Sequence, residues 1–524
     1  FRRVLFRSMS TKNLTPVLKT SFVLLAILVL LGIVMPDGYQ VWSEQLREVI
    51  SDKLGWFYLL LVTSIVLLCG FFLVSPVGQI KLGEPNSVPE HSTISWIAMI
   101  FSAGMGIGLV FYGAAEPLSH YAISTVRATP GSQEALADAF RYTFFHWGIH
   151  AWAIYALIAL ALAYFGFRKK EKYLLSVTLK PLFGKKTNGS LGKIVDTITV
   201  VATVIGVATT LGFGAAQING GLNYLFGIPN NALVQVIIII ITTILFTISA
   251  LSGLGKGVKI LSNTNLILAV GLLAITIIIG PTVQIFNTLT DSIGLYISNF
   301  FRMSFSAGSF GQYNRDWINT WTIFYWAWWI SWSPFVGVFI ARISKGRSIR
   351  QFLSIVLLAP TVLSFLWFST FGTLSTHVQS LGNVDLTQFP SEQTLFATFS
   401  QLPFGFIASV VAIILIITFF ITSADSATYV LAMLSDDGNL KPKNNLKIFW
   451  GVLLATIAIV LLLSGGLVAL QNTLIIVAFP FSLIMVLIMV SLVIELLHEK
   501  DKMGLSITPT RYPKKDQPFK SYEE

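Results

Sequence analysis

Aromatic side chains gather in two apolar stretches of this chain and could bind a cation. Six are candidates: Trp326, Trp329 and Trp332 in the run WTIFYWAWWISWSPF, and Trp147, Trp152 and Tyr155 in an earlier stretch. At 100° per residue, Trp152 and Tyr155 lie about 140° and 80° from Trp147 around a helix, so these three share one broad face. The faces of such rings attract cations, most effectively where water is excluded. The pattern predicts a site for a quaternary ammonium group.

An aromatic belt at a membrane interface is the alternative interpretation of these rings. Such a belt places rings at the ends of a span. Trp326 to Trp332 fall near the middle of their apolar segment, which favours the binding-site interpretation.

A glycine-rich stretch predicts a broken helix beside this site. It reads Ser102-Ala-Gly-Met-Gly-Ile-Gly108. Glycine weakens a helix, and a helix broken at membrane depth is tolerated where it lines a cavity. The freed N–H groups and the positive helix end suit an anion such as a carboxylate. We expect the backbone of five residues to receive it: Gly104, Met105, Gly106, Ile107 and Gly108. Close helix packing through small residues is an equal alternative.

A second interruption is expected at 331–337, where Pro334 and Gly337 lie in an apolar run. Paired broken helices are a mark of transporters built from inverted repeats. The two interruptions lie five spans apart, which suggests two repeats of five helices.

Hydroxyl groups in the segment TFFITSADS suggest a site for a hard cation. Thr422 and Ser423 are candidate sodium ligands, although ordinary hydrogen bonding between helices explains them better from the residues alone. Asp425 is either a functional carboxylate or a local cap or ion-pair partner. His146 and His150 lie four residues apart without an evident third ligand, so we expect them to serve helix packing.

The amino-acid composition of the chain indicates a membrane protein. Hydrophobic residues make up 54% of the 524 residues and charged residues 11%, against about 25% charged in soluble domains. The net charge of +11 is spread over short loops, which argues against nucleic-acid binding. Cys69 is the only cysteine, so a disulfide within the chain is excluded. No phosphate-binding loop or catalytic constellation is found, so the chain is not expected to be an enzyme and no catalytic residue is assigned.

The chain is predicted to be all-α, with twelve transmembrane helices. Apolar stretches long enough to span a bilayer lie near 17–36, 54–74, 94–115, 138–165, 194–224, 231–252, 257–283, 317–341, 348–376, 403–433, 446–466 and 469–497. The segment 284–305 is amphipathic and is predicted to lie on the membrane surface.

Loop charge predicts the orientation. The loops 166–193 and 342–350 are basic, whereas the alternate loops 37–53 and 377–402 carry few Lys or Arg residues. The positive-inside rule then places both termini in the cytoplasm.

We expect six segments along the chain. They are a non-native leader at 1–8, a cytoplasmic N-terminus with two peripheral helices at 9–93, a first five-helix repeat at 94–283, a surface helix and loop at 284–316, a second five-helix repeat at 317–497, and a cytoplasmic tail at 498–524.

Four motifs together resemble the betaine/choline/carnitine transporters, and within that family the bacterial sodium-coupled glycine betaine transporters. They are AGMGIGLVFYGAAEP, FFHWGIHAWAIYA, FYWAWWISWSPFVGVFIARISKGR and TSADSATYVLAML. The resemblance implies a LeuT-like core of two inverted five-helix repeats preceded by two extra helices. It also implies a homotrimer in the bacterial cytoplasmic membrane. By this resemblance Trp147, Trp152, Tyr155 and Trp329 form an aromatic box, with Trp326 and Trp332 along the substrate path.

The resemblance also implies where sodium, the coupling ion, would bind. A first site would use Ser102, Met105, Phe419, Thr422 and Ser423. A second would use Thr203 and Phe335, but Val207 stands where the family has a second threonine, so the number of ions stays open. Gly108 indicates sodium coupling, because relatives that do not use sodium can carry an aspartate there.

These features predict uptake of glycine betaine or a similar trimethylammonium osmolyte by sodium symport, with no cofactor. Three alternatives stay open: a proton-coupled choline importer, a sodium-independent carnitine or betaine exchanger, and an osmosensor or receptor without net transport.

Overall fold

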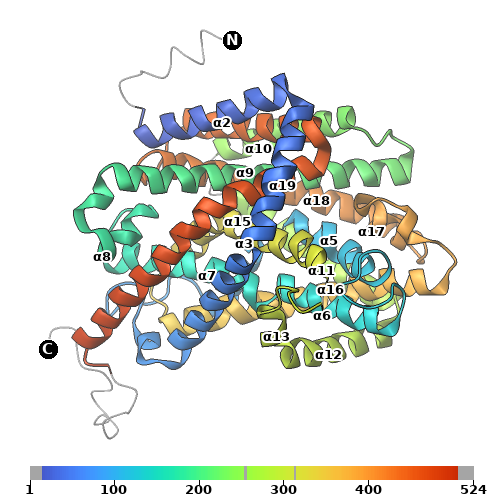
Figure 1. Cartoon of the computed structure of the whole chain (residues 1–524), viewed down its shortest axis with the longest axis horizontal. Coiled ribbons are helices and arrows are strands. Elements are labelled where there is room, and N and C mark those ends of the chain that lie inside the picture. Colours follow the sequence, from blue (N-terminus) through green and yellow to red (C-terminus); the bar gives the residue numbers. More distant parts are fainter. Residues whose placement is uncertain (1–13, 105, 253–256, 312–313, 506–524) are drawn as a thin grey trace, which may run out of the picture.

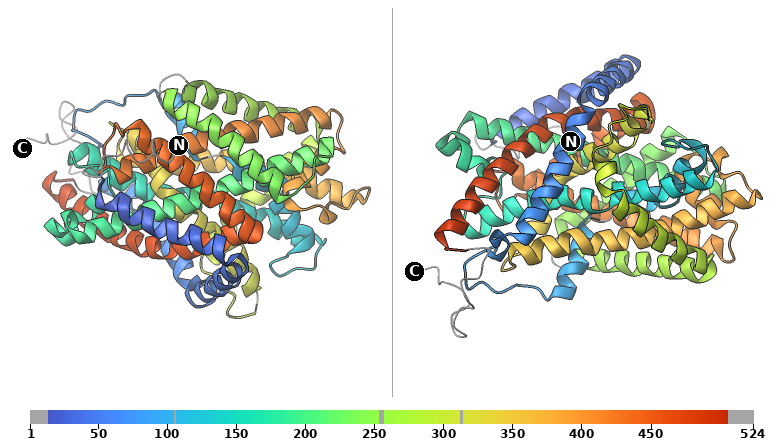
Figure 2. Two further views of the ribbon diagram at one scale, coloured as in Figure 1. Left: turned by 90° about the horizontal axis from the view of Figure 1, so that it is seen from above. Right: turned by 60° about the horizontal axis from the view of Figure 1, so that its bottom comes forward.

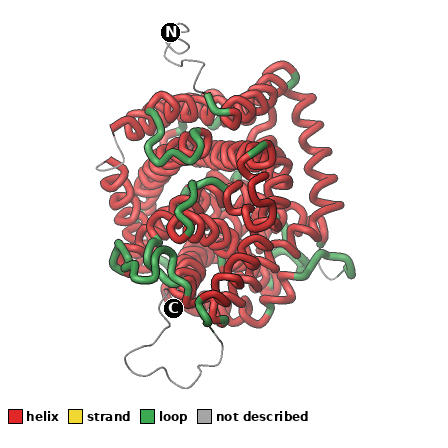
Figure 3. The backbone as a smooth tube through the Cα atoms, turned by 90° about the vertical axis from the view of Figure 1, so that its left-hand side faces the viewer, coloured by secondary structure: helices red, strands yellow, loops and turns green. Residues whose placement is uncertain are grey.

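The computed structural model describes residues 14–104, 106–252, 257–311 and 314–505, without the side chains of 102, 103, 252 and 257–260. Within these ranges the chain is helical, and Figure 3 shows helices joined by loops. The α-helices are α2 Pro16–Val34, α3 Pro36–Val74, α4 Thr93–Gly104, α5 Ile107–Leu118, α6 Gln133–Trp147, α7 Ile149–Ala163, α8 Lys180–Phe183, α9 Ser190–Phe226, α10 Ala232–Ser252, α11 Gly257–Ile279, α12 Thr282–Ser298, α13 Phe300–Ser304, α14 Arg315–Thr320, α15 Thr322–Ile343, α16 Ile349–Leu381, α17 Ser391–Phe399, α18 Gly405–Ser435 and α19 Asn444–Lys502.

Six short helical turns complete the described structure. Two are π-helical, η3 Ser119–Ile123 and η4 Tyr164–Arg168. The others are 3₁₀ turns: η2 Pro76–Gln79, η5 Ser176–Leu179, η6 Gly184–Asn188 and η7 Leu386–Gln388.

Ten helices of the described chain are long and apolar enough to cross a membrane, where the sequence predicts twelve spans. Two features account for the difference. The predicted third span is divided into α4 and α5, each of 12 residues. The predicted last two spans are joined in α19, whose backbone leaves helical geometry at Gly465 and Gly466. In Figure 1 the two halves of α19 run in different directions.

Burial separates inner helices from outer ones. In the most apolar windows of Gln133–Arg168 and Arg315–Ile343, 94% of the residues are buried, against 28% in α2 and 22% in Ala232–Leu251. The inner helix α15 packs against α7, α9 and α19. Figure 2 shows α2 and α10 on the outside of the bundle. The aromatic segments of the sequence therefore lie in the interior.

The predicted amphipathic segment is helical. It forms α12 and α13, with α12 at the lower edge of the bundle in Figure 1. Phe286, Ile297 and Phe301 leave about half of their surface or more exposed.

The predicted interruption at 331–337 is wrong, because α15 runs unbroken through Pro334. Proline cannot bond the carbonyl four residues earlier. Here the hydroxyl of Ser333 donates to the Ile330 carbonyl at 2.8 Å and so satisfies the acceptor that the proline leaves. Hydroxyl side chains perform this function in membrane helices. An unpredicted break lies instead at Gly148, between α6 and α7.

Buried ion pairs connect the C-terminal end of α19 to the segment after α7. The buried carboxylate of Glu499 accepts from Arg168 Nε at 2.9 Å and Nη2 at 2.8 Å, and from Lys169 Nζ at 3.1 Å. Arg168 Nη1 also donates to the Gly83 carbonyl at 2.9 Å, so one guanidinium links α19 to the segment before α4.

We predict that Glu499→Ala destabilises the protein. Removing one partner of a buried ion pair costs about 3 kcal/mol or more, and Arg168 and Lys169 both lose this carboxylate. The thermal unfolding midpoint of the purified protein in detergent should fall by several degrees. The matched control is Glu84→Ala, which removes an exposed ion pair with Lys170 and should leave the midpoint unchanged. Equal midpoints for the two variants would contradict the assignment.

Candidate functional site

Four of the predicted aromatic residues form a continuous set of ring contacts. Trp147 meets Trp329 edge-on with centroids 4.9 Å apart, Tyr155 meets Trp329 at 5.9 Å, and Trp152 meets Tyr155 at 5.5 Å. All four are at most 5% exposed. We call Trp147, Trp152, Tyr155 and Trp329 the aromatic box. Three helices, α6, α7 and α15, supply it.

Hydrogen bonds fix the tilt of two box rings. The indole of Trp329 donates to the backbone carbonyl of His146 at 2.9 Å, and that of Trp147 donates to Glu116 Oε2 at 2.7 Å. The carbonyls in the last turn of a helix have no partner within the helix. The break at Gly148 ends α6 and so frees the His146 carbonyl for this contact.

The glycines of the broken third span pack against these rings. A Cβ atom on Gly104 would lie 2.1 Å from Cη2 of Trp152, and one on Gly108 would lie 2.6 Å from Cη2 of Trp328. At Gly106 the nearest atoms are Ser423 Oγ at 3.6 Å and Trp332 Cη2 at 3.9 Å. Glycine is required at 104 and 108 because any side chain would collide with an indole.

A small cavity lies between the glycines and the rings. It is lined by Gly104, Gly106, Gly108, Leu109, Trp147, Thr210, Trp328, Trp329 and Trp332. Its volume is about 10 Å³, close to the minimum for one water molecule. A quaternary ammonium group, the ligand predicted from the sequence, is larger than this cavity.

The predicted break in the third span is confirmed. Helix α4 ends at Gly104 and α5 begins at Ile107, with Gly106 extended at φ −152°. The positive end of the α5 dipole therefore lies at the break, beside the cavity. Met105 lies outside the described residues. Ile107 is buried at the first turn of α5.

The structure brings Trp332 close to the cavity and leaves Trp326 away from it. Trp332 donates its indole N–H to the Gly206 carbonyl at 2.9 Å and lines the cavity. Trp326 stacks on His150 with centroids 5.6 Å apart. Trp328, which the sequence analysis did not assign to the site, is stacked on Trp329 at an interplanar angle of 3°.

Residues predicted for the first sodium site lie on α18 opposite the break. Thr422 Oγ1 accepts from Asn265 Nδ2 at 2.9 Å and donates to the Thr418 carbonyl at 2.9 Å. Ser423 faces Gly106, and Phe419 is buried. Met105 and the side chain of Ser102 lie outside the described residues, so this ligand set stays a prediction.

Residues predicted for the second sodium site lie on α9 and α15, which pack together. The hydroxyl of Thr203 donates to the Thr199 carbonyl at 2.7 Å. Phe335 is buried against Trp332, with ring centroids 5.5 Å apart, and Val207 is buried.

Asp425 is hydrogen-bonded to a neighbouring helix, which is neither a local cap nor an ion pair. Its Oδ2 accepts from the hydroxyl of Ser249 on α10 at 2.6 Å. Only 1% of Asp425 is exposed.

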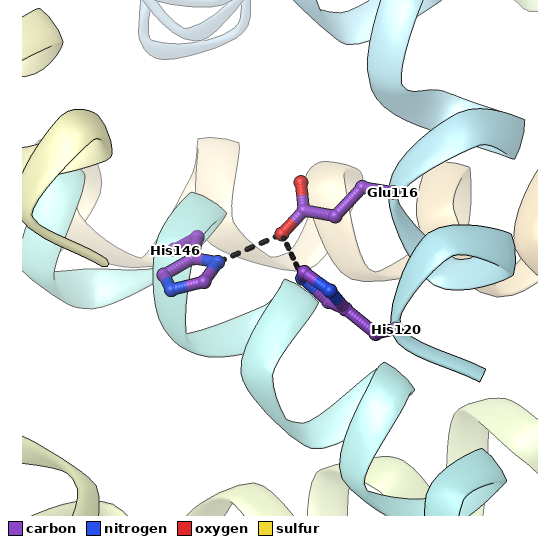
Figure 4. Close-up of side chains that lie close together, drawn as sticks. All are labelled: Glu116, His120 and His146. Atoms are coloured by element: carbon purple, nitrogen blue, oxygen red, sulfur yellow. Dashed lines mark hydrogen bonds and ion pairs between the residues drawn. The ribbon is translucent and has the colours of Figure 1, made fainter. Parts of the chain in front are cut away.

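A buried carboxylate that the sequence analysis overlooked lies beside the aromatic box. Figure 4 shows Glu116 of α5 between His120 and His146. Glu116 Oε1 lies 2.7 Å from His146 Nδ1 and 3.2 Å from His120 Nε2. Its Oε2 accepts from Trp147 and, at 2.5 Å, from the hydroxyl of Tyr325. All five residues are at most 4% exposed.

Hydrogen bonding accounts for this cluster. One ligand atom each from Glu116, His120 and His146 lies within 4.8 Å of the others, as around metal ions. Each carboxylate oxygen, however, already has two hydrogen-bond partners, and His146 Nε2 is bonded to Thr322 Oγ1 at 2.9 Å. His150 takes a different partner, Ser304 Oγ at 2.8 Å. The two histidines of the α6–α7 segment therefore serve separate contacts.

One feature of the sequence could have identified Glu116 as a candidate. Glu116 follows the apolar run of the third span directly, in the segment GAAEPL, and an ionisable residue at such a position is a functional candidate by default.

Comparison with known proteins finds similarity to one family of transporters. The model of the betaine/carnitine/choline (BCCT) family of transporters matches residues 16–501. The glycine betaine transporter OpuD of Bacillus subtilis is 54% identical over 489 residues, which cover 93% of this chain and 96% of that protein. A glycine betaine transporter of Acinetobacter baylyi is 42% identical, covering 94% and 74%. An ectoine/hydroxyectoine transporter of Virgibacillus pantothenticus is also 42% identical, covering 92% and 96%.

We predict that Gly104→Ala weakens binding of a trimethylammonium ligand by about tenfold or more, because overpacking costs roughly 1–3 kcal/mol. The added methyl displaces Trp152 from the box. Equilibrium binding of labelled glycine betaine to the purified protein measures the effect. Gly70→Ala on α3 is the matched control, since nothing lies within 4 Å of a Cβ atom added there. Equal losses in the two variants would show that the Trp152 contact is not decisive.

Proposed function

The chain belongs to the betaine/carnitine/choline family of transporters, and from this we propose that it imports glycine betaine or a similar trimethylammonium osmolyte by sodium symport. It is a multi-pass membrane protein and a transporter rather than an enzyme. The relatives named for glycine betaine and for ectoine transport support an osmolyte as the substrate.

The observation that carries the proposal is the aromatic box beside the broken third span. Aromatic faces attract a trimethylammonium group, with up to about 2 kcal/mol for each desolvated contact. The start of α5 offers a positive dipole end to a carboxylate. A zwitterion with both groups a few bonds apart fits this pair of features, whereas choline has no carboxylate for the second.

Sodium as the coupling ion is supported by the hydroxyls opposite the break. Thr422 and Ser423 lie on α18, and Ser423 faces Gly106 across the helix interface. An ion held there would link the broken span to α18. Each charge moving inward gains about 2.3 kcal/mol per 100 mV of membrane potential, in addition to its concentration gradient, so uphill uptake is feasible.

We further propose the membrane arrangement that the sequence predicts. Twelve spans form two inverted five-helix repeats at 94–283 and 317–497 behind two extra helices, with both termini in the cytoplasm of a bacterium. The exposed apolar residues of α12 and α13, among them Ile297 and Phe301, are the proposed contact surface of a homotrimer.

The test is uptake of labelled glycine betaine into proteoliposomes with an inward sodium gradient, compared with potassium in its place. We expect accumulation above equilibrium only with sodium. Unlabelled choline, carnitine and ectoine added as competitors rank the substrates.

Each alternative gives a distinct outcome. Uptake driven by a proton gradient and inhibited best by choline indicates a choline importer. Uptake that needs preloaded internal substrate, with or without sodium, indicates an exchanger. Binding without uptake or counterflow indicates an osmosensor or receptor.

We predict that the double change Thr422→Ala and Ser423→Ala raises the sodium concentration for half-maximal uptake by about tenfold or more, because a hard cation loses two oxygen ligands. Sodium titration of betaine uptake measures the shift. Thr418→Ala is the matched control on the same helix, since its hydroxyl bonds only the carbonyls of Ile414 and Leu415. An unchanged sodium curve in the double variant would remove this site.

A further inference from the structure

The carboxylate of Glu116 lies behind the aromatic box and has no part in the function proposed so far. Four side chains from three parts of the bundle surround it: His120 of η3, His146 and Trp147 of α6, and Tyr325 of α15. Glu116 itself is fully buried. Figure 4 shows its carboxylate directed at both histidines.

The contacts indicate an ionised carboxylate. The indole of Trp147 can only donate, and the remaining three groups can each donate one hydrogen bond. An ionised carboxylate accepts all four bonds, whereas a protonated acid would need one of its neighbours to become an acceptor. Charge-assisted hydrogen bonds of this kind are strong.

The donors leave that charge without a permanent counter-charge among them. None of the four is a lysine or arginine. Nδ1 of His120 is buried without a hydrogen-bond partner, which favours a neutral ring, because an imidazolium would bury an unpaired N–H there. His146 has a partner on each ring nitrogen, so of the two histidines it is the one whose contacts would suit an imidazolium. A buried carboxylate with no lysine or arginine among its donors is costly inside a membrane protein and marks functional positions.

The charge is coupled directly to the box. Glu116 Oε2 lies 2.7 Å from the indole nitrogen of Trp147, and Trp147 meets Trp329 at 4.9 Å. A negative charge at the positive edge of an indole makes the ring face more attractive to a cation. The same bond holds Trp147 at its angle to Trp329.

We propose that Glu116 determines the preference for a positively charged head group: it positions Trp147 and supplies a buried negative charge that favours a trimethylammonium group over a neutral group of the same shape. This inference rests on the proposed function. It assigns specificity to a residue that does not belong to the aromatic box.

A pair of ligands tests the charge directly. Glycine betaine and 3,3-dimethylbutanoate have the same shape and the same carboxylate, but a carbon replaces the cationic nitrogen in the second. The affinities of both are measured by competition with labelled betaine, at saturating sodium, on the purified full chain. In Glu116→Gln the affinity for betaine should fall by about tenfold or more, as expected for loss of one charge in a low-dielectric interior. The affinity for 3,3-dimethylbutanoate should change little or rise, because its only charge is negative.

Two variants separate charge from structure. Tyr325→Phe removes one donor to Glu116 but keeps the carboxylate, so it should preserve the ratio of the two affinities. Glu116→Asp keeps the charge on a shorter side chain and should preserve the ratio even where both ligands bind more weakly. If 3,3-dimethylbutanoate binds too weakly to measure, a fall in betaine affinity in Glu116→Gln but not in Tyr325→Phe supports the proposal.

Equal losses of both ligands in Glu116→Gln would show that Glu116 only maintains the fold of the site and would overturn the proposal. Unchanged affinities would overturn it as well. Failure of the proposed substrate is distinguishable, because the unaltered protein would then not bind betaine, and failure of sodium symport would show in the proteoliposome assay while betaine still binds. If it binds choline instead, the same test is made with choline and 3,3-dimethylbutan-1-ol.

Discussion

The indole N–H groups of four tryptophans at the candidate site each donate to a protein acceptor, and these bonds set the geometry of the site. Water is excluded from the interior of a membrane bundle, so a buried donor is costly unless the protein satisfies it. The acceptors are the Glu116 carboxylate for Trp147, the His146 carbonyl for Trp329, the Thr210 hydroxyl for Trp328 and the Gly206 carbonyl for Trp332. Each bond fixes the tilt of one ring. Two of the four rings of the aromatic box, those of Trp147 and Trp329, are therefore positioned by polar groups that lie outside the box.

The same bonds limit how the site can open. The cavity between the rings is too small for the proposed substrate. Gly104 and Gly108 pack so closely against Trp152 and Trp328 that even an added methyl group would collide with them. Because the anchors of Trp147 and Trp332 lie on α5 and α9, a ring cannot turn away without losing its acceptor. Movement of α9 together with α15, and of α5 together with α6, keeps the bonds of Trp332 and Trp147, whereas turning of the single side chains breaks them. This is consistent with the movement of whole helices that alternating access in transporters requires.

Much of the fold was predictable because hydropathy and glycine act locally. Long apolar runs predicted the helices, and the clustered glycines from 104 to 108 predicted the break between α4 and α5. The break expected near Pro334 is absent because the hydroxyl of Ser333 satisfies the carbonyl that the proline leaves. The break at Gly148 was not predicted, since a lone glycine within a helical pattern is usually tolerated.

The aromatic residues show where prediction from spacing ends. Trp326, Trp329 and Trp332 follow one spacing, yet Trp326 faces His150 while the other two line the cavity. The position of a residue in a helix gives only the direction of its side chain around the helix axis. The packing of the neighbouring helices determines which side chains reach a given cavity. Trp328 enters the cavity lining because α9 offers its indole the hydroxyl of Thr210.

The network around Glu116 illustrates the same limit for polar residues. His146 lies 30 residues from Glu116 in the sequence and Tyr325 lies 209 residues away, so no local pattern connects them. What connects them is the crossing of α5, α6 and α15, which only the tertiary fold creates. A carboxylate that requires three separate elements to satisfy it holds those elements together as well. In this proposal Glu116 therefore has two roles. Its carboxylate orients Trp147 of the aromatic box, and its negative charge attracts a cationic substrate.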